Sequence, residues 1–319
     1  MEAVLRRTKV AILGSGATGT DLMIKVLEES SSLELVAMAG LGAASPGLVE
    51  ADRLGVPTTN RGVGGLRTMP HYGEVDIVFD VTALAAARCG QADSLRSDGK
   101  RVINLSPAAG GRCVVPAVNL DRLLGEPEVN IGTRAGQTTI PIVAAITRVT
   151  EVAYAEVGAY VASKAVGPWF VPDVDEFLRR TSSGVESVGG AKIGRTIIIL
   201  SPDSAPARTR DTVLALITEP DPSVHAAVRA SVEAMAAEVA EYVPGYRLRH
   251  DVRIVPFAAD DLLLGLIGDS AVTHQISVNV EVEAPVDSGK GPLGSLDAAT
   301  SAAVRVGDRI AALRTAPVG

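Results

Sequence analysis

Short apolar runs and amphipathic stretches alternate along the first third of the chain. The apolar runs predict β-strands at 9–13, 33–39, 76–81 and 102–105, and helical periodicity between them predicts helices at 20–29, 47–54 and 84–98. Strands that alternate with helices are typical of βαβ units, whose strands form a parallel sheet.

The pattern changes in the rest of the chain, where longer strands surround fewer helices. Strands are predicted at 153–162, 196–201, 252–255 and 275–282, and helices at 137–148, 174–180, 224–241 and 296–313. This arrangement predicts a mixed or antiparallel sheet, the usual form of a substrate and dimerisation domain.

Composition supports a globular α/β protein of two domains. A chain of 319 residues, with 47% hydrophobic and 21% charged residues, is longer than one small core supports. Because only 3% of the residues are aromatic, we expect the core to consist of Ala, Val, Leu and Ile.

The net charge and the cysteine content indicate which binding partners and which cellular compartment suit the protein. The net charge of −7, with no basic stripe, argues against binding to nucleic acid. Cys89 and Cys113 do not form a disulfide framework, which favours a reducing compartment. With no apolar signal segment at the start and no run of ~18 apolar residues, we expect a cytoplasmic protein without membrane spans.

A glycine-rich loop follows the first predicted strand and opens the first helix. Its residues are Gly14, Ser15, Gly16, Ala17, Thr18 and Gly19, which fit the pattern G-x-G-x-x-G. In this context the three glycines permit a tight turn, close approach of a pyrophosphate and close packing of helix on strand. The loop therefore predicts dinucleotide binding; the alternative is a glycine turn without a ligand.

The end of the second strand leaves the choice of cofactor open between NAD and NADP. A carboxylate expected there would hold the ribose 2′-hydroxyl, but residues 38–42 read Met-Ala-Gly-Leu-Gly. Its absence removes repulsion against a 2′-phosphate, although no arginine sits right beside this position to bind one.

These features predict an α/β fold with a Rossmann-like, parallel-sheet dinucleotide-binding domain at 1–131. A mixed α/β substrate and dimerisation domain is expected at 132–294, and the C-terminal segment 295–319 is expected to form a helix that packs back on the first domain.

Ten segments, in order and at comparable spacing, resemble the acylating acetaldehyde dehydrogenases that act with 4-hydroxy-2-oxovalerate aldolases. They are 12–21 (ILGSGATGTD), 77–82 (IVFDVT), 104–109 (NLSPAA), 118–120 (VNL), 135–144 (AGQTTIPIVA), 163–164 (SK) with 167–168 (GP), 175–177 (DEF), 188–192 (VGGAK), 210–213 (RDTV) and 242–248 (YVPGYRL). The resemblance implies a small carbonyl substrate, an NAD-type cofactor, coenzyme A as acyl acceptor, a homodimer and an aldolase partner.

The position of the family's catalytic cysteine is occupied by Arg134 in this sequence. Arginine stays protonated and is not a nucleophile, so thioester chemistry cannot run from it. Asp211 matches the aspartate that supports the nucleophile, and we expect it to form an ion pair with Arg134. Arg134 would then bind a substrate carboxylate or polarise a C=O or C=N bond. Lys164 is a candidate proton donor or a solvated surface lysine.

The resemblance also implies positions for the rest of the site. On the cofactor side these are the glycine loop with Thr82, Ser106, Pro107 and Ser295; on the substrate side they are Thr133, Gln137, Ser163, Trp169 and Phe170. Thr133 and Gln137 are equally compatible with helix capping, and the two aromatic rings with an ordinary core role.

Other candidate reactive groups are weaker. Cys113, beside Arg112, is a possible substitute nucleophile, but a lone cysteine is more often a small buried hydrophobe, and Cys89 is expected to be structural. The four histidines have no metal-ligand spacing, so no metal is expected.

Three functions are compatible with this sequence. The first is an oxidoreductase that retains hydride transfer to a C=O or C=N bond without a covalent intermediate. The second is the coenzyme A-dependent family reaction, with Cys113 or with no covalent step. The third is a non-catalytic scaffold or partner subunit of an aldolase.

Overall fold

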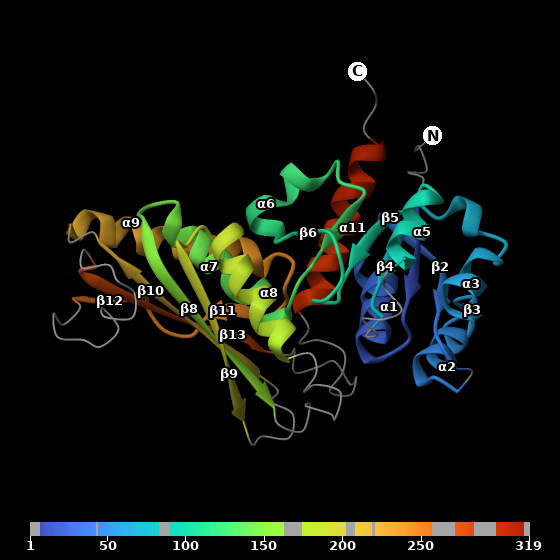
Figure 1. The fold of residues 1–319 in the computed structure, drawn as a ribbon, viewed down its shortest axis with the longest axis horizontal. Helices are drawn as coiled ribbons and strands as arrows, with labels where there is room; N and C mark the ends of the chain where they lie inside the picture. Colours follow the sequence, from blue (N-terminus) through green and yellow to red (C-terminus); the bar gives the residue numbers. More distant parts are fainter. Residues whose placement is uncertain are drawn as a thin grey trace. The chain divides into compact units, whose positions relative to one another are not determined.

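The structure, a computed structural model, describes residues 7–42, 44–82, 90–162, 174–201, 208–218, 221–256, 272–283 and 298–315. These residues form two compact units (Figure 1). Unit 1 draws on 1–116, 120–132 and 299–319, and unit 2 draws on 117–119 and 133–298.

Unit 1 is built on a seven-stranded parallel sheet with the order β3-β2-β1-β4-β5-β7-β6. Its strands are β1 (Thr8–Leu13), β2 (Leu33–Ala39), β3 (Thr58–Thr59), β4 (Ile77–Asp80), β5 (Arg101–Asn104), β6 (Arg112–Cys113) and β7 (Glu128–Asn130). Its helices are α1 (Ala17–Glu29), α2 (Pro46–Arg53), α3 (Gly62–Arg67), α5 (Gln91–Ser97), most of α6 (Pro116–Leu123) and of α11 (Ala298–Thr315), with a 3-10 turn η1 (Tyr72–Glu74).

Helices cover both faces of this sheet, which explains why its central strands are apolar throughout. On one face, Ala11 and Leu13 of β1 pack in a buried cluster with Leu66 of α3 and Leu95 of α5. On the other face, Gly307 of α11 lies so close to Leu33 and Phe79 that a β-carbon there would come within 3.0 Å of both side chains.

A buried polar cluster joins α1 to α11 within unit 1. Lys25 Nζ lies 3.0 Å from Asp21 Oδ2, and both side chains are at most 3% exposed. Thr300 of α11 accepts a hydrogen bond from Lys25 Nζ at 2.6 Å and donates one to Asp21. Because each charge lies beside its partner and a hydroxyl, the cluster is tolerated among apolar side chains.

Unit 2 is a six-stranded mixed sheet with the order β11-β13-β10-β8-β9, to which β12 adds by pairing with β13. Its strands are β8 (Val152–Ala162), β9 (Ile193–Ser201), β10 (Arg208–Ile217), β11 (Tyr246–Leu248), β12 (Arg253–Pro256) and β13 (His274–Glu283), and its helices are α7 (Arg134–Thr147), α8 (Val174–Ser187) and α9 (Pro222–Ala240). Only the β8–β9 pair is parallel.

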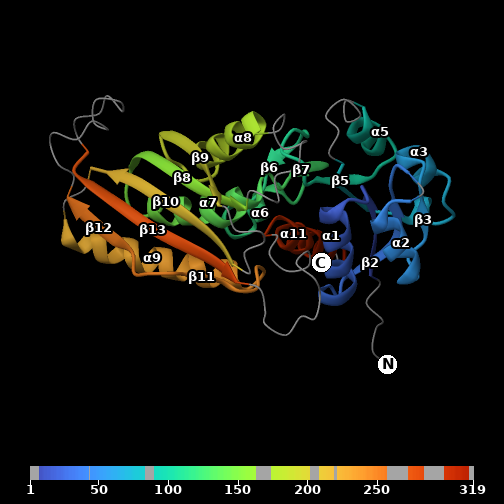
Figure 2. The ribbon, with the colours of Figure 1, turned by 90° about the horizontal axis from the view of Figure 1, so that it is seen from below.

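The three helices that the described residues of unit 2 form lie on one face of its sheet (Figure 1). Figure 2 looks onto the opposite face, which no helix of the described residues covers. Alternation along β9 assigns its side chains: Gly194 and Thr196 contact α8, so Ile193, Ile197 and Ile199 belong to the uncovered face.

The predicted fold class is confirmed: a Rossmann-like parallel sheet and a separate mixed α/β unit. Several boundaries differ. The predicted helix at 174–180 extends to Ser187, and the helix predicted from 137 begins at Arg134. The strand β10 was not predicted, although it lies at the centre of the second sheet. Part of the helix predicted at 84–98 falls outside the described residues.

Among the described residues, no helix is both long and apolar enough to cross a lipid bilayer.

We predict that Lys25→Met destabilises unit 1 strongly, because it leaves the Asp21 carboxylate buried without its cation. Breaking a buried pair in this way costs about 3–5 kcal/mol, or on the order of 10 °C in thermal midpoint for a unit of this size. Lys9→Met, which breaks the partly exposed Lys9–Glu74 pair, is the matched control and should cost no more than about 1 kcal/mol. Equal midpoints for the two variants, measured by calorimetry, would contradict the prediction.

Candidate functional site

The glycine loop of unit 1 has the backbone geometry that its sequence predicts. Gly14 has φ of +121°, and a β-carbon there would lie 2.9 Å from the carbonyl of Val81. A β-carbon at Gly19 would lie 2.1 Å from the Gly14 carbonyl oxygen, so α1 packs directly on the loop. Only glycine fits these two positions.

The middle glycine faces open space. A β-carbon at Gly16 would meet no atom within 4 Å, in contrast to Gly14 and Gly19. Gly16 is the N-cap residue of α1, whose first-turn N–H groups have no partner inside the helix. An open approach to unpaired N–H groups at a helix N-terminus suits a pyrophosphate, so these residues fit a dinucleotide.

The loop is fixed from the side by the start of α2. Ser45 Oγ donates hydrogen bonds to Ser15 Oγ at 2.7 Å and to the Ser15 carbonyl at 3.0 Å. A β-carbon at Gly47 would come within 2.3 Å of the same carbonyl. Ser15 is therefore held by α2, and its role is to position the loop.

The carboxyl ends of β1, β4 and β5 bring the other predicted cofactor residues to the same edge of the sheet. Chain order reverses between β1 and β4, which is where α/β proteins bind ligands. Thr82 follows β4, and its N–H and hydroxyl both donate to Asp80 Oδ1, at 2.9 and 2.7 Å. Ser106 and Pro107 follow β5.

Two asparagines that the sequence analysis did not single out as site residues shape the loop after β5. Asn130 Nδ2 donates to the carbonyl groups of Ser106, Ala109 and Gly110 at 2.8–3.1 Å. Asn104 Nδ2 donates to the Gly110 carbonyl at 3.1 Å. Both asparagines are fully buried at the carboxyl ends of neighbouring strands. An asparagine that ends an apolar run was therefore the signal in the sequence that could have identified them.

The end of β2 differs from its sequence-based interpretation. Leu41 forms an isolated antiparallel bridge with Arg61, which follows β3. The expectation that no arginine lies beside this strand end is therefore wrong. Arg61 lies there, although it comes twenty positions after Leu41 in the sequence.

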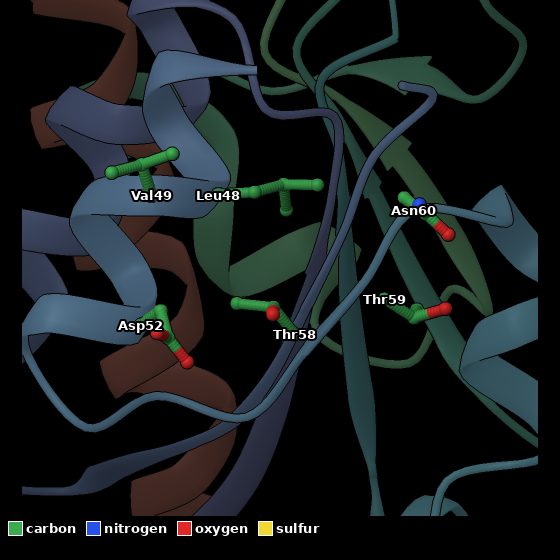
Figure 3. Close-up of a pocket in the computed structure, with 6 residues that line it drawn as sticks. All are labelled: Leu48, Val49, Asp52, Thr58, Thr59 and Asn60. Atoms are coloured by element: carbon green, nitrogen blue, oxygen red, sulfur yellow. The ribbon is translucent and has the colours of Figure 1, made fainter. Parts of the chain in front are cut away.

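A pocket of about 430 Å³ opens between α2 and β3 (Figure 3). Its described lining consists of Leu48, Val49 and Asp52 from α2 and Thr58, Thr59 and Asn60 from β3 and the residue after it. Figure 3 shows Leu48 in the middle, with Asp52 and Asn60 at opposite ends.

Unit 2 holds the predicted pair of Arg134 and Asp211. Arg134 is the first residue of α7; its Nη1 and Nη2 donate to Asp211 Oδ2 and Oδ1 at 3.1 and 3.4 Å. Nη2 also donates to the Tyr160 carbonyl at 3.2 Å. The Asp211 side chain is 1% exposed and that of Arg134 is 23% exposed, so the guanidinium covers the carboxylate and retains a solvent-facing part.

Further donors complete the shell around Asp211. Thr138 Oγ1 donates to its Oδ2 at 2.6 Å, and the Tyr160 N–H donates to Oδ1 at 3.2 Å. These donors compensate for the burial of the carboxyl group. Asp211 thus orients Arg134 through the ion pair.

The first turns of α7 are rigid for local reasons. Thr133 caps the helix by accepting from the Gly136 N–H at 2.9 Å, and its hydroxyl bonds that of Thr181 at 2.7 Å. Tyr246 donates to the Thr138 carbonyl at 2.7 Å, and its complete burial raises its pKa well above the usual range. Gln137 is fully buried in the same turn. The capping role expected of Thr133 is therefore present.

The remaining predicted site residues divide into two groups. Ser163, Lys164, Trp169, Phe170 and Ser295 lie outside the described residues, as does Cys89. Cys113 is a half-buried cysteine on β6, and β7 and β5 lie between it and β4 in the sheet of unit 1. At about 4.8 Å per strand, it lies on the order of 14 Å from the strand that Thr82 follows.

Comparisons with known proteins point to one family. The family model described as "Prokaryotic acetaldehyde dehydrogenase, dimerisation" matches residues 134–288, which begin at Arg134. "Acetaldehyde dehydrogenase 1" of Nocardioides sp. is 50% identical over 310 residues, covering 97% of this chain and 98% of the relative. "Acetaldehyde dehydrogenase 5" of Rhodococcus jostii is 49% identical over 315 residues, covering 98% and 96%.

We predict that Gly16→Ala weakens dinucleotide binding by about tenfold or more without unfolding unit 1, because its methyl group enters only the space where phosphates approach. Gly64→Ala in α3, where a β-carbon also meets no atom within 4 Å, is the control: it should leave binding unchanged and should not lower the thermal midpoint, because alanine favours a helix. Titration with NADH and NADPH measures both variants. Unchanged affinity for both cofactors in Gly16→Ala would place the binding site elsewhere.

Proposed function

The chain belongs to the acetaldehyde dehydrogenase family, and we propose that this NAD(P)-dependent oxidoreductase transfers hydride to a C=O or C=N substrate without a covalent enzyme intermediate. We assign cofactor binding to unit 1 and substrate binding and dimerisation to unit 2. The observation that carries the proposal is the guanidinium of Arg134, which occupies the position expected to hold the family's nucleophile.

Arg134 retains donors for a substrate. Three of its five N–H groups make the hydrogen bonds to Asp211 and Tyr160, which leaves two without a partner among the described residues. Its side chain is 23% exposed, so a ligand oxygen can reach it. The ion pair with Asp211 fixes the guanidinium in place, so it does not need to reorganise when a substrate binds.

The charge balance of the Arg134–Asp211 pair determines which substrate atom it can bind. Because Asp211 already compensates the charge of Arg134, the pair suits a neutral acceptor, such as a carbonyl oxygen or an unprotonated imine nitrogen. A protonated iminium has no lone pair with which to accept a hydrogen bond from the guanidinium. Arg134 therefore favours a carbonyl substrate, with a neutral imine as the alternative.

In the proposed reaction, the glycine loop of unit 1 would hold an NAD-type cofactor, which would supply a hydride for the substrate carbon. Arg134 donates to the substrate oxygen and stabilises the negative charge that develops there, with added potential from the N-terminus of α7. A proton must then reach that oxygen, and Lys164 remains the candidate donor. The arginine side chain at position 134 cannot form a thioester.

We predict that Arg134→Gln lowers kcat/KM for carbonyl reduction by about 10²–10³-fold, the usual effect of removing a charge-stabilising donor. Affinity for NADH and NADPH should change less than about twofold, because unit 1 carries the cofactor loop. Arg179→Gln, which alters an exposed arginine of α8, is the control and should retain activity. Absorbance at the reduced-nicotinamide wavelength follows turnover over a panel of aldehydes, ketones and imines.

The second candidate is acyl-CoA formation, the reaction that the resemblance to the acylating acetaldehyde dehydrogenases implies, with Cys113 as nucleophile. Under our proposal, wild-type protein given acetaldehyde, NAD⁺ and coenzyme A forms no acetyl-CoA, and Cys113→Ala reduces carbonyls like the wild type. Acetyl-CoA formation that disappears in Cys113→Ala would replace our proposal with this one. Failure to bind either cofactor would favour a non-catalytic subunit.

We further propose that the chain forms a homodimer through the uncovered face of the unit 2 sheet. The matched family model is one of dimerisation and covers this sheet. The face carries Ile193, Ile197 and Ile199 of β9 and Leu214 of β10, and Ile193 is 43% exposed. These apolar side chains, which no helix of the described residues covers, are expected to be buried by a second copy, although polar residues such as Arg195 and Glu156 share the face.

We predict that Ile197→Asp shifts the dimer toward monomer, because it places a charge in the apolar part of this face. Sedimentation velocity at several concentrations measures the shift. Ser183→Asp, on the exposed side of α8, is the control and should remain dimeric. A wild-type monomer, or a dimer of unchanged affinity in Ile197→Asp, would exclude this interface.

A further inference from the structure

We infer that this chain selects the 2′-phosphorylated dinucleotide, NADP(H), over NAD(H), and that Arg61 is the residue that binds the 2′-phosphate. The inference rests on the proposed function and names the cofactor that this function uses. Arg61 was not among the predicted site residues.

The backbone places Arg61 at the end of β2, where a Rossmann-type fold holds the adenosine ribose. The Gly40 N–H donates to the Thr59 carbonyl and the Gly62 N–H to the Gly40 carbonyl, both at 2.9 Å. Between these bonds, Arg61 forms its bridge with Leu41, which brings the two Cα atoms to about 5 Å. Two backbone hydrogen bonds therefore fix the position of the arginine.

The charge of Arg61 is not committed to another group. Its side chain is exposed, and Nη2 donates to the Thr68 hydroxyl at 3.2 Å. Within the described ranges it has no carboxylate partner, whereas Arg53 pairs with Glu50 and Arg67 with Asp98. A phosphate can accept from two nitrogens of such a guanidinium at once, which makes arginine the preferred binder of this group.

The usual discriminator against a 2′-phosphate is missing from the same place. The β2 strand is followed by Gly40, Leu41 and Gly42 rather than by a carboxylate. Asp52 is the one acidic residue in the described lining of the neighbouring pocket, and it lies at the end opposite Asn60, the residue next to Arg61 (Figure 3). The acidic residue of the pocket therefore lies at its far end from Asn60, the residue that precedes Arg61.

The pocket beside Arg61 suits the rest of an adenosine. Leu48 and Val49 supply apolar surface for a flat base, and Thr58, Thr59 and Asn60 supply hydrogen-bonding groups along its other side. The mixture of a few polar groups with apolar surface is typical of nucleoside sites. Phosphate-binding loop, pocket and arginine all lie around the carboxyl end of β2.

The test compares NADPH with NADH by fluorescence titration of the full-length protein, and adenosine 2′,5′-bisphosphate with 5′-AMP by calorimetry. We expect the 2′-phosphorylated member of each pair to bind at least about tenfold more tightly. Arg61→Ala should weaken NADPH binding by about 10- to 100-fold and NADH binding by less than about twofold, since only the former has the phosphate. Leu41→Asp should also remove the preference, because its carboxylate would pair with Arg61 and repel phosphate.

Arg67→Ala is the control: it removes an exposed arginine of α3 in the same unit and should leave both affinities unchanged. NADH binding as tightly as NADPH in the wild type, or equal weakening of both cofactors in Arg61→Ala, would overturn the inference and leave the proposed function intact. Binding of neither cofactor by the folded wild type would overturn both.

Discussion

The arrangement of unit 2 depends on a carboxylate that is buried in the middle of a sheet. Asp211 is 1% exposed, and such a charge is stable only when donors surround it. Thr138, the Tyr160 backbone and Arg134 provide these donors from α7 and β8. The guanidinium at the start of α7 therefore balances the charge of this carboxylate. Arg134 itself cannot attack a carbonyl carbon, because arginine stays protonated.

Unit 1 meets a different constraint, the close packing of backbone around a phosphate loop. Gly14 and Gly19 are required because neighbouring backbone leaves no space for a side chain, and Gly16 is open toward solvent. Parallel strands then bring residues that are far apart in sequence to one edge, including Thr82 and Ser106. The same principle brings Arg61 to the end of β2. In our proposals, cofactor binding and cofactor selection are supplied by different loops at one edge of the sheet.

Much of unit 1 could be predicted because its signals are local. The glycine loop, the apolar strand before it and the amphipathic helix after it lie within twenty-five residues. The strand β10 was missed because its first half, Arg-Thr-Arg-Asp-Thr, is polar, and only pairing with β8 and β13 makes it a central strand. Arg61 was missed for the same reason: its neighbour Leu41 is defined by a bridge across the sheet. The ion pair of Arg134 and Asp211 was predictable only from the family resemblance, which places both residues in one site. The hydrophobic periodicity of the sequence does not relate these two distant positions.

The contact between Lys25 and Thr300 has a consequence for how the protein is made. These residues are 275 positions apart, so a ribosome that adds about 5–20 residues per second needs about 15–55 s to supply the second after the first. During that interval, α1 has been synthesised but a polar neighbour of its buried charges has not. Unit 1 can therefore be completed only after α11 has been synthesised, and a translation product truncated before α11 would leave the apolar face around Leu33 and Phe79 without this helix.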